Sequence, residues 1–150
     1  MQLEFTEIDP HGPVFESLAR PLYRALRPAL SDAAFTAFAR EGAAQGLVFT
    51  AARTPDGRCA ALAAHRVLAT SRGRVLFVDD LVGDPALRGA GAGGALWEEL
   101  VRRARLAGCV RVELDSGVTN HGAHRFYHRK RMAVAAFHFS YDLAQDPETT

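Results

Sequence analysis

A run of glycines near the middle of the chain has the clearest chemical potential. Residues 88–94 read Arg-Gly-Ala-Gly-Ala-Gly-Gly and open a segment with helical periodicity. Glycines let backbone N–H groups approach a ligand closely, and the N-terminus of a helix adds partial positive charge. Arg88 supplies a permanent cation at the rim of the run. The run therefore predicts a site for an anionic pyrophosphate, formed by Arg88, Gly89, Ala90, Gly91, Ala92, Gly93 and Gly94.

A dinucleotide is a competing ligand for this run. Three of the glycines satisfy G-x-G-x-x-G, and Glu113 or Asp115 lies near the expected position of the acid that binds the ribose. However, residues 79–88 separate the run from the preceding strand, which itself belongs to a predicted hairpin. Too little chain follows Asp115 for a second mononucleotide-binding unit. We therefore favour a different pyrophosphate ligand, and a flexible turn without a ligand remains a further alternative.

Hydrophobic periodicity predicts the elements that must position this run, in the order β-α-α-β-β-β-α-β-α-β. Helices are expected at residues 13–29, from an N-cap at Ser31 to about 42–46, at 89–107 and at 121–131. Strands are expected at residues 2–8, 47–53, 59–68, 75–78, 110–115 and 133–141. The turn Pro55-Asp56-Gly57 predicts an antiparallel hairpin, whereas the strand-helix-strand segment 75–115 predicts a parallel crossover. The sequence therefore indicates one α/β domain, residues 1–150, with a mixed central β-sheet and helices on both faces.

Composition and charge exclude several classes of protein. The 150 residues suffice for one domain, and a formal net charge of +1 gives no general affinity for nucleic acid or a membrane surface. The N-terminus does not resemble a signal peptide, and the two cysteines are expected to be buried and reduced. The scattered histidines indicate no metal site, and the basic cluster at 124–131 is interpreted as a solvated helix face. We expect a cytoplasmic protein that binds neither nucleic acid nor a membrane.

The glycine run and the residues before it resemble the cofactor motif of the GNAT superfamily of N-acetyltransferases. The acetyl-CoA signature of that superfamily, R/Q-x-x-G-x-G/A, is matched by Arg88, Gly91 and Gly93. Residues 80–85 resemble its acidic-aliphatic-aliphatic approach to the loop. Position 92 carries Ala, where a larger aliphatic residue is usual.

A second GNAT motif follows downstream. The helix pattern N-x-x-A-x-x-F-Y is matched by Asn120, Ala123, Phe126 and Tyr127. Arg131-Met132 departs from the superfamily, in which Gly-Phe is usual after this helix. The two motifs cover about residues 75–141, and the order of elements extends the resemblance to the whole chain.

The resemblance implies transfer of an acetyl group from acetyl-CoA to a primary amine, by direct attack in a ternary complex. The amine must be neutral, the oxyanion must be stabilised and the leaving thiolate must gain a proton. Tyr127 is the candidate acid, because a phenol and an alkyl thiol have comparable pKa values of roughly 10 and 8.5. Asp79 or Asp80, at the end of the strand that enters the loop, is the candidate base. Glu113 and Asp115 are further carboxylates at the end of the next strand.

The resemblance also implies contacts along the pantetheine arm. Main-chain groups of Leu81, Val82 and Gly83 are expected to bind the oxyanion and the pantetheine amides, because a β-bulge in the superfamily exposes them. Asn120 is expected to hydrogen-bond the pantetheine, with an N-cap of the following helix as an equally weighted alternative. For Tyr127 the alternative is a core aromatic residue beside Phe126.

Three questions stay open at the level of sequence. A non-catalytic acyl-CoA-binding or regulatory protein is the alternative to an enzyme. Polyamines, aminoglycosides, amino acids, peptide N-termini and lysines are all compatible acceptors. The aromatic last strand, with Phe137, Phe139 and Tyr141, could supply the interface of a homodimer.

Overall fold

A mixed β-sheet forms the frame of the protein, as the sequence predicts, and it contains five of the six expected strands. The computed structural model describes residues 2–144, and the chain divides into two compact units, one up to Leu114 and one from Asp115. In chain order the elements are β1 (Glu4–Ile8), α1 (Phe15–Leu26), α2 (Asp32–Ala44), β2 (Val48–Arg53), β3 (Cys59–Thr70), β4 (Gly73–Gly83), the 3-10 helix η1 (Pro85–Leu87), α3 (Ala92–Leu106), β5 (Arg111–Leu114) and α4 (His121–Arg129). In residues 2–144, no helix combines the length and the apolar character needed to cross a membrane.

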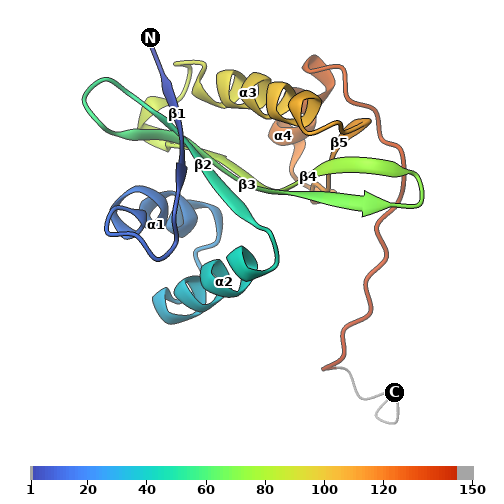
Figure 1. Cartoon of the computed structure of the whole chain (residues 1–150), viewed down its shortest axis with the longest axis horizontal. Helices are drawn as coiled ribbons and strands as arrows, with labels where there is room; N and C mark the ends of the chain where they lie inside the picture. The colour runs from blue at the N-terminus through green and yellow to red at the C-terminus, as the bar shows by residue number, and fades with distance from the viewer. Residues whose placement is uncertain (1, 145–150) are drawn as a thin grey trace. The chain divides into compact units, whose positions relative to one another are not determined.

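The strands lie in the order β1-β2-β3-β4-β5, so each strand neighbours the next one in the chain (Figure 1). Strands β1 to β4 pair antiparallel, and β5 pairs parallel to β4. The predicted hairpin is the pair β2–β3, and α3 forms the crossover between β4 and β5. Both expectations about the sheet are therefore confirmed.

Helices cover both faces of the sheet, α1 and α2 on one face and α3 on the other (Figure 1). Aromatic rings pack the α1–α2 side, where the centroid of Phe15 lies 5.5 Å from that of Phe35 and 5.0 Å from that of Phe49. Aliphatic side chains pack the α3 side, including the fully buried Leu96 and Leu100. Because β4 contributes side chains to both layers, the two cores together fix its position.

Strand β4 carries one extra residue at Asp79. Val78 lies opposite His65 of β3, and Asp80 lies opposite the adjacent residue Ala64, so no residue of β3 lies opposite Asp79. This two-against-one arrangement is a β-bulge, which bends the strand and re-aims the side chains that follow. The parallel pairing with β5 also ends at Val78, opposite Leu114. Beyond the bulge, β4 is therefore paired only with β3 among the strands of the first unit.

Buried polar groups lie within the first unit. His65 Nε2 and Thr50 Oγ1 are 2.8 Å apart, and burial lowers the pKa of His65 to about 4, so the ring is neutral at pH 7. Glu99 of α3 is 9% exposed and accepts a hydrogen bond from Arg103. Arg103 also pairs with Glu7 of β1 at 2.6 Å. The polar pairs therefore link α3 to the opposite edge of the sheet.

Two predicted boundaries are wrong at the candidate site. The helix predicted from residue 89 begins at Ala92, because Gly89 and Gly91 have φ values of 83° and 78°, which cannot continue a right-handed helix. The strand predicted at 75–78 extends over Gly73–Gly83, so Asp79 and Asp80 lie inside it instead of at its end. The strand is longer because residues 79–83 also pair with β3 or form its bulge, and the hydrophobic pattern of the sequence does not indicate this pairing.

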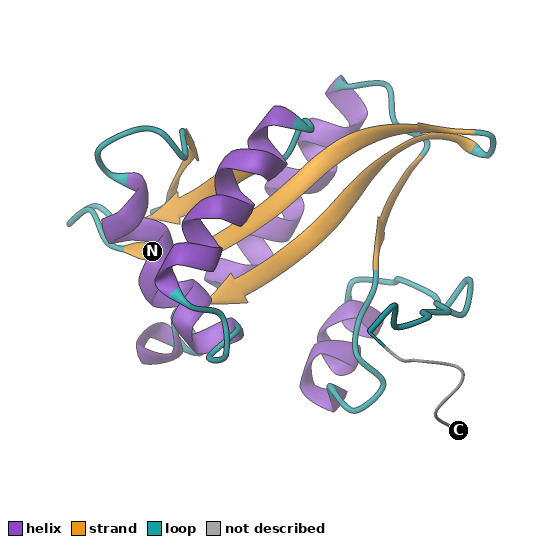
Figure 2. Cartoon of the chain, turned by 90° about the horizontal axis from the view of Figure 1, so that it is seen from below, coloured by secondary structure: helices purple, strands orange, loops and turns teal. Residues whose placement is uncertain are grey.

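The predicted strand at residues 133–141 is not formed. After α4 the described chain runs on without helix or strand (Figure 2), and Phe137, Phe139 and Tyr141 are 84%, 90% and 69% exposed. Apolar and polar residues do alternate there, but a strand also needs a neighbour to pair its N–H and C=O groups. No strand within residues 2–144 supplies that neighbour. The order of elements therefore ends at α4 in this part of the chain.

Helix α4 ends two residues earlier than predicted, in a left-handed cap formed by Arg131. The φ of Arg131 is 63°, its N–H donates to His128 O at 3.0 Å, and the N–H of Met132 donates to Tyr127 O at 3.0 Å. This is the hydrogen-bond pattern of a Schellman cap, which glycine normally closes. The departure from the usual glycine is therefore accommodated with backbone strain at Arg131.

Arg131→Gly should raise the free energy of unfolding by about 1 kcal/mol, because glycine adopts this conformation without the steric penalty of a Cβ atom. Arg129→Gly is the matched control, since that residue is helical and its loss should destabilise the protein by about 1 kcal/mol. Chemical denaturation followed by circular dichroism measures both. An Arg131→Gly protein no more stable than wild type would show that the strain is absent or offset.

Candidate functional site

The glycine run forms a helix N-terminus without a side-chain cap. Gly91 is the N-cap residue of α3 and offers no side-chain acceptor to the N–H groups of the first turn. These N–H groups have no partner within the helix and carry partial positive charge. A Cβ atom added at Gly89, Gly91 or Gly93 would have no heavy atom within 4 Å. Open space therefore lies beside a helix N-terminus, an arrangement that lets an anion approach the backbone.

The 3-10 helix η1 sets the entry to the run. Asp84 Oδ1 accepts a hydrogen bond from the N–H of Ala86 at 2.9 Å and so caps η1, while its Oδ2 pairs with Arg58 at 3.0 Å. The N–H of Asp84 donates to Ala60 O at 2.9 Å, which ties the end of β4 to β3. Arg88 follows η1 directly and is exposed, so the predicted cation lies at the surface beside the run.

Residues 81–83 lie in the part of β4 that follows the bulge, where one edge of the strand has no neighbouring strand in the first unit. On one side these residues pair with residues 61–63 of β3. On the other side the pairing of β4 with β5 has already ended at Val78. Alternate N–H and C=O groups therefore face no strand of the first unit, in agreement with the bulge that the sequence resemblance implies. An extended ligand that carries amide groups can pair with such an edge.

Asp80 is held by a buried tyrosine and an arginine at the end of α1. The Tyr23 hydroxyl donates to Oδ2 at 2.9 Å, and Arg27 Nη2 donates to Oδ1 at 3.1 Å. Tyr23 is 3% exposed, and burial together with the charge of Asp80 raises the pKa of its hydroxyl, which stays protonated. The two donors fix the carboxylate, and each of its oxygens keeps a lone pair for another partner.

Asp79 has a different partner, Arg66 of β3. Arg66 Nε and Nη2 donate to the two carboxylate oxygens at 3.1 and 3.0 Å, a bidentate pair across the bulge. One guanidinium group therefore engages both oxygens of Asp79. The bulge thus separates the two predicted base candidates, since Asp79 is bound to β3 and Asp80 to α1.

In the second unit, α4 and its N-cap carry the two candidate site residues of the downstream motif, Asn120 and Tyr127. Asn120 Oδ1 accepts from the N–H of Ala123 at 3.4 Å, so its side chain is the N-cap of α4. Tyr127 is half-buried, and its ring packs edge-on against Phe126 with 5.4 Å between centroids. Burial raises the pKa of the Tyr127 hydroxyl, which favours the protonated form that a general acid needs.

The remaining two candidate carboxylates each pair with a residue of their own strand or unit. Glu113 accepts from Arg111 Nε at 3.1 Å within β5, and Asp115 pairs with His138 Nδ1 at 3.1 Å within the second unit. Across residues 2–144, His, Cys, Asp and Glu side chains form no group of three that could hold a metal ion. Cys59 is buried, and burial raises the pKa of its thiol to about 11.

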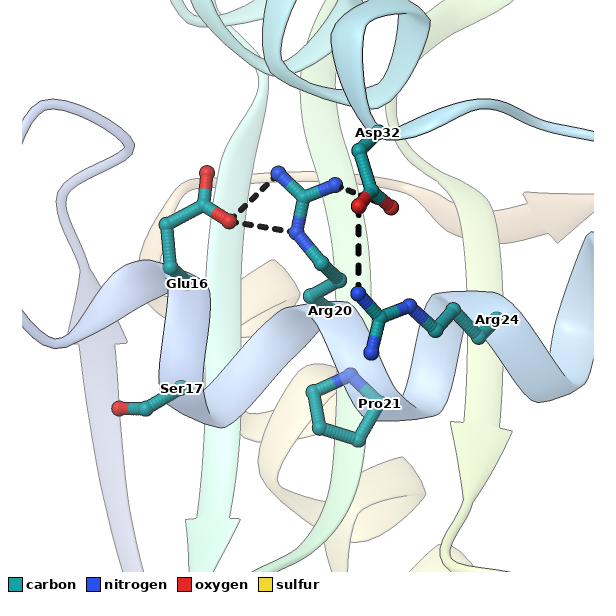
Figure 3. A pocket seen from close by; sticks show the side chains of 6 residues that line it. All are labelled: Glu16, Ser17, Arg20, Pro21, Arg24 and Asp32. Carbon is teal, nitrogen blue, oxygen red and sulfur yellow. Dashed lines mark hydrogen bonds and ion pairs between the residues drawn. The ribbon is translucent and has the colours of Figure 1, made fainter.

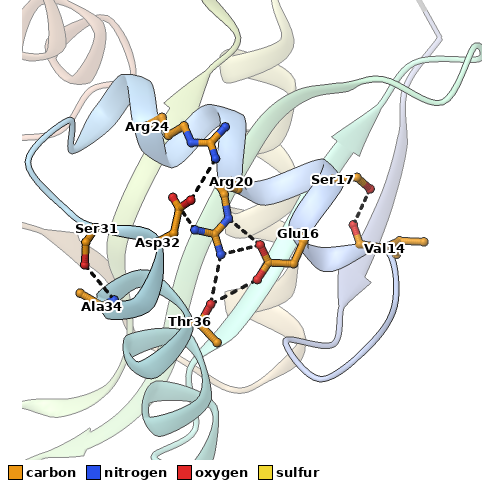
Figure 4. A network of polar contacts seen from close by, with 9 residues as sticks. All are labelled: Val14, Glu16, Ser17, Arg20, Arg24, Ser31, Asp32, Ala34 and Thr36. Atoms are coloured by element: carbon orange, nitrogen blue, oxygen red, sulfur yellow. Dashed lines mark hydrogen bonds and ion pairs between the residues drawn. The ribbon is translucent and has the colours of Figure 1, made fainter.

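A hollow of about 580 Å³ lies elsewhere, on the outer side of α1 and α2 (Figure 3). Arg20 lies between Glu16 and Asp32, and Arg24 also reaches Asp32 (Figure 4). Hydrogen bonds from Arg20 lower the pKa values of both carboxyl groups. The Arg20 guanidinium also lies 5.1 Å from the centroid of the Phe35 ring. This network joins α1 to α2, and the hollow contains none of the residues predicted to bind acetyl-CoA.

Sequence reasoning missed three residues that hold the candidate carboxylates, namely Tyr23, Arg27 and Arg66. Tyr23 lies on the apolar stripe of α1 and was indistinguishable from its core neighbours. The sequence contains many arginines, and the spacing of Arg27 and Arg66 does not indicate that their side chains bind carboxylates of β4. Their partners are 57, 53 and 13 residues away in the chain, so only the folded structure identifies them.

Comparison with known proteins finds similar chains among the acetyltransferases. A curated relative, glucosamine 6-phosphate N-acetyltransferase 1 of Oryza sativa subsp. japonica, is 41% identical over 94 residues, which cover 59% of this chain and 57% of the rice protein. The structure of a Trypanosoma brucei acetyltransferase is 26% identical with a TM-score of 0.74, covering 95% of this chain and 100% of that one. The structure of an aminoglycoside N-acetyltransferase in complex with CoA has a TM-score of 0.80 at 17% identity, covering 96% of each chain, which shows the fold alone.

The model of the acetyltransferase (GNAT) family matches residues 13–132. That match extends from the residues before α1 to the cap of α4, and it includes the glycine run, the bulged strand and the downstream helix. The chain therefore belongs to the acetyltransferase (GNAT) family, whose co-substrate is acetyl-CoA.

Proposed function

We propose that this chain is an acetyl-CoA-dependent N-acetyltransferase that transfers the acetyl group to a primary amine by direct attack in a ternary complex. One observation carries the proposal most strongly. The bulged strand β4, which is paired with β3 alone beyond the bulge, leads through η1 to a helix N-terminus without a side-chain cap. The strand edge suits the amides of pantetheine, and the helix end suits the pyrophosphate. Residues 1–150 would form one catalytic domain, which is consistent with a family match that spans both units.

The cofactor would lie along residues 81–94. Main-chain N–H groups at the start of α3 would hold the pyrophosphate, and Arg88 would add a cation at its rim. Main-chain groups of Leu81, Val82 and Gly83 would pair with the pantetheine and bind the oxyanion of the tetrahedral intermediate. Asn120 already caps α4 through its side-chain oxygen, so any contact with the pantetheine would use its amide nitrogen.

Proton transfer would be divided between Tyr127 and a carboxylate of β4. Tyr127 would return a proton to the thiolate of CoA, and its half-buried hydroxyl is protonated at neutral pH. Of the two base candidates we favour Asp80, acting directly or through a water molecule. Its oxygens each accept one bond from a different donor, whereas one guanidinium group binds both oxygens of Asp79. Asp79 would then serve to hold the bulge.

The acceptor is proposed only as a class. Two of the proteins similar to this chain are named for amino sugars, glucosamine 6-phosphate and aminoglycosides. Amino sugars are therefore the first acceptors to test, followed by polyamines, amino acids and peptide amines. We further propose that the enzyme works in the cytoplasm and as a homodimer. Release of free CoA thiol with any of these amines would exclude a protein that only binds acyl-CoA.

The cofactor site is tested by adding side chains at Gly93. This residue lies in the first turn of α3 with open space in front of it and an ordinary helical backbone, unlike Gly91. Gly93→Ala should not destabilise the fold and can stabilise the helix by up to about 0.5–1 kcal/mol. Gly93→Val should weaken acetyl-CoA binding by at least about tenfold, with Gly93→Ala between Val and wild type. Calorimetric titration of the folded variants measures this series.

The Gly93 series also distinguishes acetyl-CoA from a dinucleotide as the ligand. Affinity for acetyl-CoA that stays within about threefold of wild type in Gly93→Val would refute the assignment of the pyrophosphate to this helix end. A parallel titration with NADH separates the dinucleotide alternative, because a dinucleotide enzyme would bind NADH and lose that binding in the same series.

The catalytic acid is tested by removing hydroxyl groups, and the chain offers a matched set of three tyrosines. Tyr127→Phe should lower kcat by ~10²–10⁴-fold while leaving the affinity for acetyl-CoA unchanged, because only the proton donor is lost. Tyr23→Phe should lower kcat less, since it removes one of two groups that orient Asp80. Tyr141→Phe, at an exposed position, should be silent.

Steady-state kinetics distinguish the alternatives for Tyr127. If KM for acetyl-CoA rises while kcat holds, Tyr127 binds the cofactor and is not the acid. If neither parameter changes by more than a few-fold, the hydroxyl is dispensable and Tyr127 is a packing residue beside Phe126.

A further inference from the structure

Arg27, which caps the C-terminus of α1, uses little of its hydrogen-bonding capacity. Its Nη2 donates to Asp80 Oδ1 at 3.1 Å, and its side chain has no other hydrogen bond or ion pair within residues 2–144. A guanidinium group has several N–H donors, so most of them remain for another acceptor. The side chain of Arg27 is 59% exposed, whereas that of Asp80 is 12% exposed. Arg27 therefore extends from Asp80 to the surface, where its other donors are open to a ligand.

The second arginine at the bulge, Arg66, differs in both respects. It uses Nε and Nη2 to engage both oxygens of Asp79, and its side chain is only 20% exposed. This bidentate pair occupies a whole edge of the guanidinium fork. The adjacent carboxylates of β4 are therefore balanced differently, because the cation beside Asp80 remains accessible and the cation beside Asp79 does not. Of these two arginines, Arg27 is the one that combines spare donors with an exposed side chain.

The position of Arg27 matches the acceptor end of the proposed site. The pyrophosphate is assigned to the start of α3 and the pantetheine to residues 81–83, so the acyl group would follow towards Asp80. Neighbouring residues of a strand are about 3.3 Å apart along its axis, so Asp80 directly follows the proposed pantetheine contacts. An amine that approaches Asp80 would therefore lie within reach of the Arg27 side chain.

The Arg27–Asp80 pair has the charge pattern of a binding site for a zwitterion. Stability gives a weak reason for the pair, because a partly exposed ion pair contributes little to folding. Tyr23 already holds the other oxygen of Asp80 from the core, so the carboxylate can be oriented without an exposed cation. A carboxylate and an accessible guanidinium group side by side complement a molecule that carries both an ammonium group and an anion.

We propose that Arg27 is a specificity-determining residue, which selects amine acceptors that carry a carboxylate or phosphate group. The amine of the acceptor approaches Asp80, and the anion accepts hydrogen bonds from the Arg27 nitrogens that Asp80 leaves open. Polyamines, which carry a second cation in place of the anion, are disfavoured by repulsion from Arg27. This inference rests on the proposed acetyl transfer with Asp80 as its base, and it narrows the class of acceptor.

Matched pairs of acceptors test the proposal in the wild-type protein and in Arg27→Gln. Glucosamine 6-phosphate is compared with glucosamine, and glycine with glycinamide, by measuring kcat/KM from the release of CoA thiol. The ratio within each pair is then compared between the two proteins, which cancels the intrinsic reactivity of each amine and any general effect on Asp80. Arg27→Gln should lower this ratio by at least about tenfold in one pair or both, as expected for the loss of a charge-assisted hydrogen bond. The pair that responds identifies the anion as phosphate or carboxylate.

Arg24→Gln is the matched control. Arg24 lies one turn earlier in α1, is 61% exposed and pairs through Nη2 with an aspartate outside the candidate site, Asp32 (Figure 3). Its replacement should leave both ratios unchanged. Arg27→Lys keeps the charge without the planar fork, so it should retain part of the preference for anionic acceptors. A higher salt concentration should weaken that preference in the wild-type protein.

Other results would overturn the proposal. An equal loss with both members of each pair in Arg27→Gln would mean that Arg27 only orients Asp80. Ratios and rates that both stay unchanged would mean that Arg27 forms a surface ion pair without a role in recognition. An equal fall of the ratios in Arg24→Gln would assign the preference to general surface charge. By contrast, a protein that releases no CoA thiol with any acceptor, charged or uncharged, would refute the proposed acetyl transfer itself, and this inference with it.

Discussion

Strand β4 is hydrogen-bonded to β5 for only part of its length, and the rest of the candidate site depends on that. The pairing ends at Val78, one residue before the bulge at Asp79, and the remaining residues of β4 keep β3 as their only neighbouring strand in the first unit. Backbone N–H and C=O groups need partners, and an edge that the sheet leaves unpaired must pair with water or a ligand. The edge leads through η1 to the start of α3, where the N–H groups of the first turn are also without side-chain partners.

Polar pairs hold this geometry more than they stabilise the fold. Partly exposed ion pairs are worth about 0–1 kcal/mol each, far less than the two apolar cores that pack β4 from both sides. Their effect is directional. Arg66 binds Asp79, the extra residue of the bulge, while Tyr23 and Arg27 orient Asp80 towards α1. The same bulge that splits the sheet therefore sends two adjacent carboxylates to different partners.

The sequence was informative where local patterns decide the structure. The glycine run at 88–94 predicted a backbone that other residues would not readily adopt, and Gly89 and Gly91 both have positive φ. The hairpin turn and the alternation of strands predicted a mixed sheet. The failures concern pairing between distant residues, since neither the length of β4 nor the partner of Asp80 is encoded nearby. The segment 133–141 has the pattern of a strand without a strand beside it. At Arg131, a missing glycine did not abolish the cap, because the cap requires only a tolerable positive φ.

The most direct test is amide hydrogen exchange with and without saturating acetyl-CoA. It shows whether the unpaired edge of β4 and the N-terminus of α3 form one cofactor site. We predict that acetyl-CoA slows exchange at residues 81–83 and 92–94 together, with little change in β1 and β2. Protection confined to other parts of the chain, with these two segments unchanged at saturation, would contradict it.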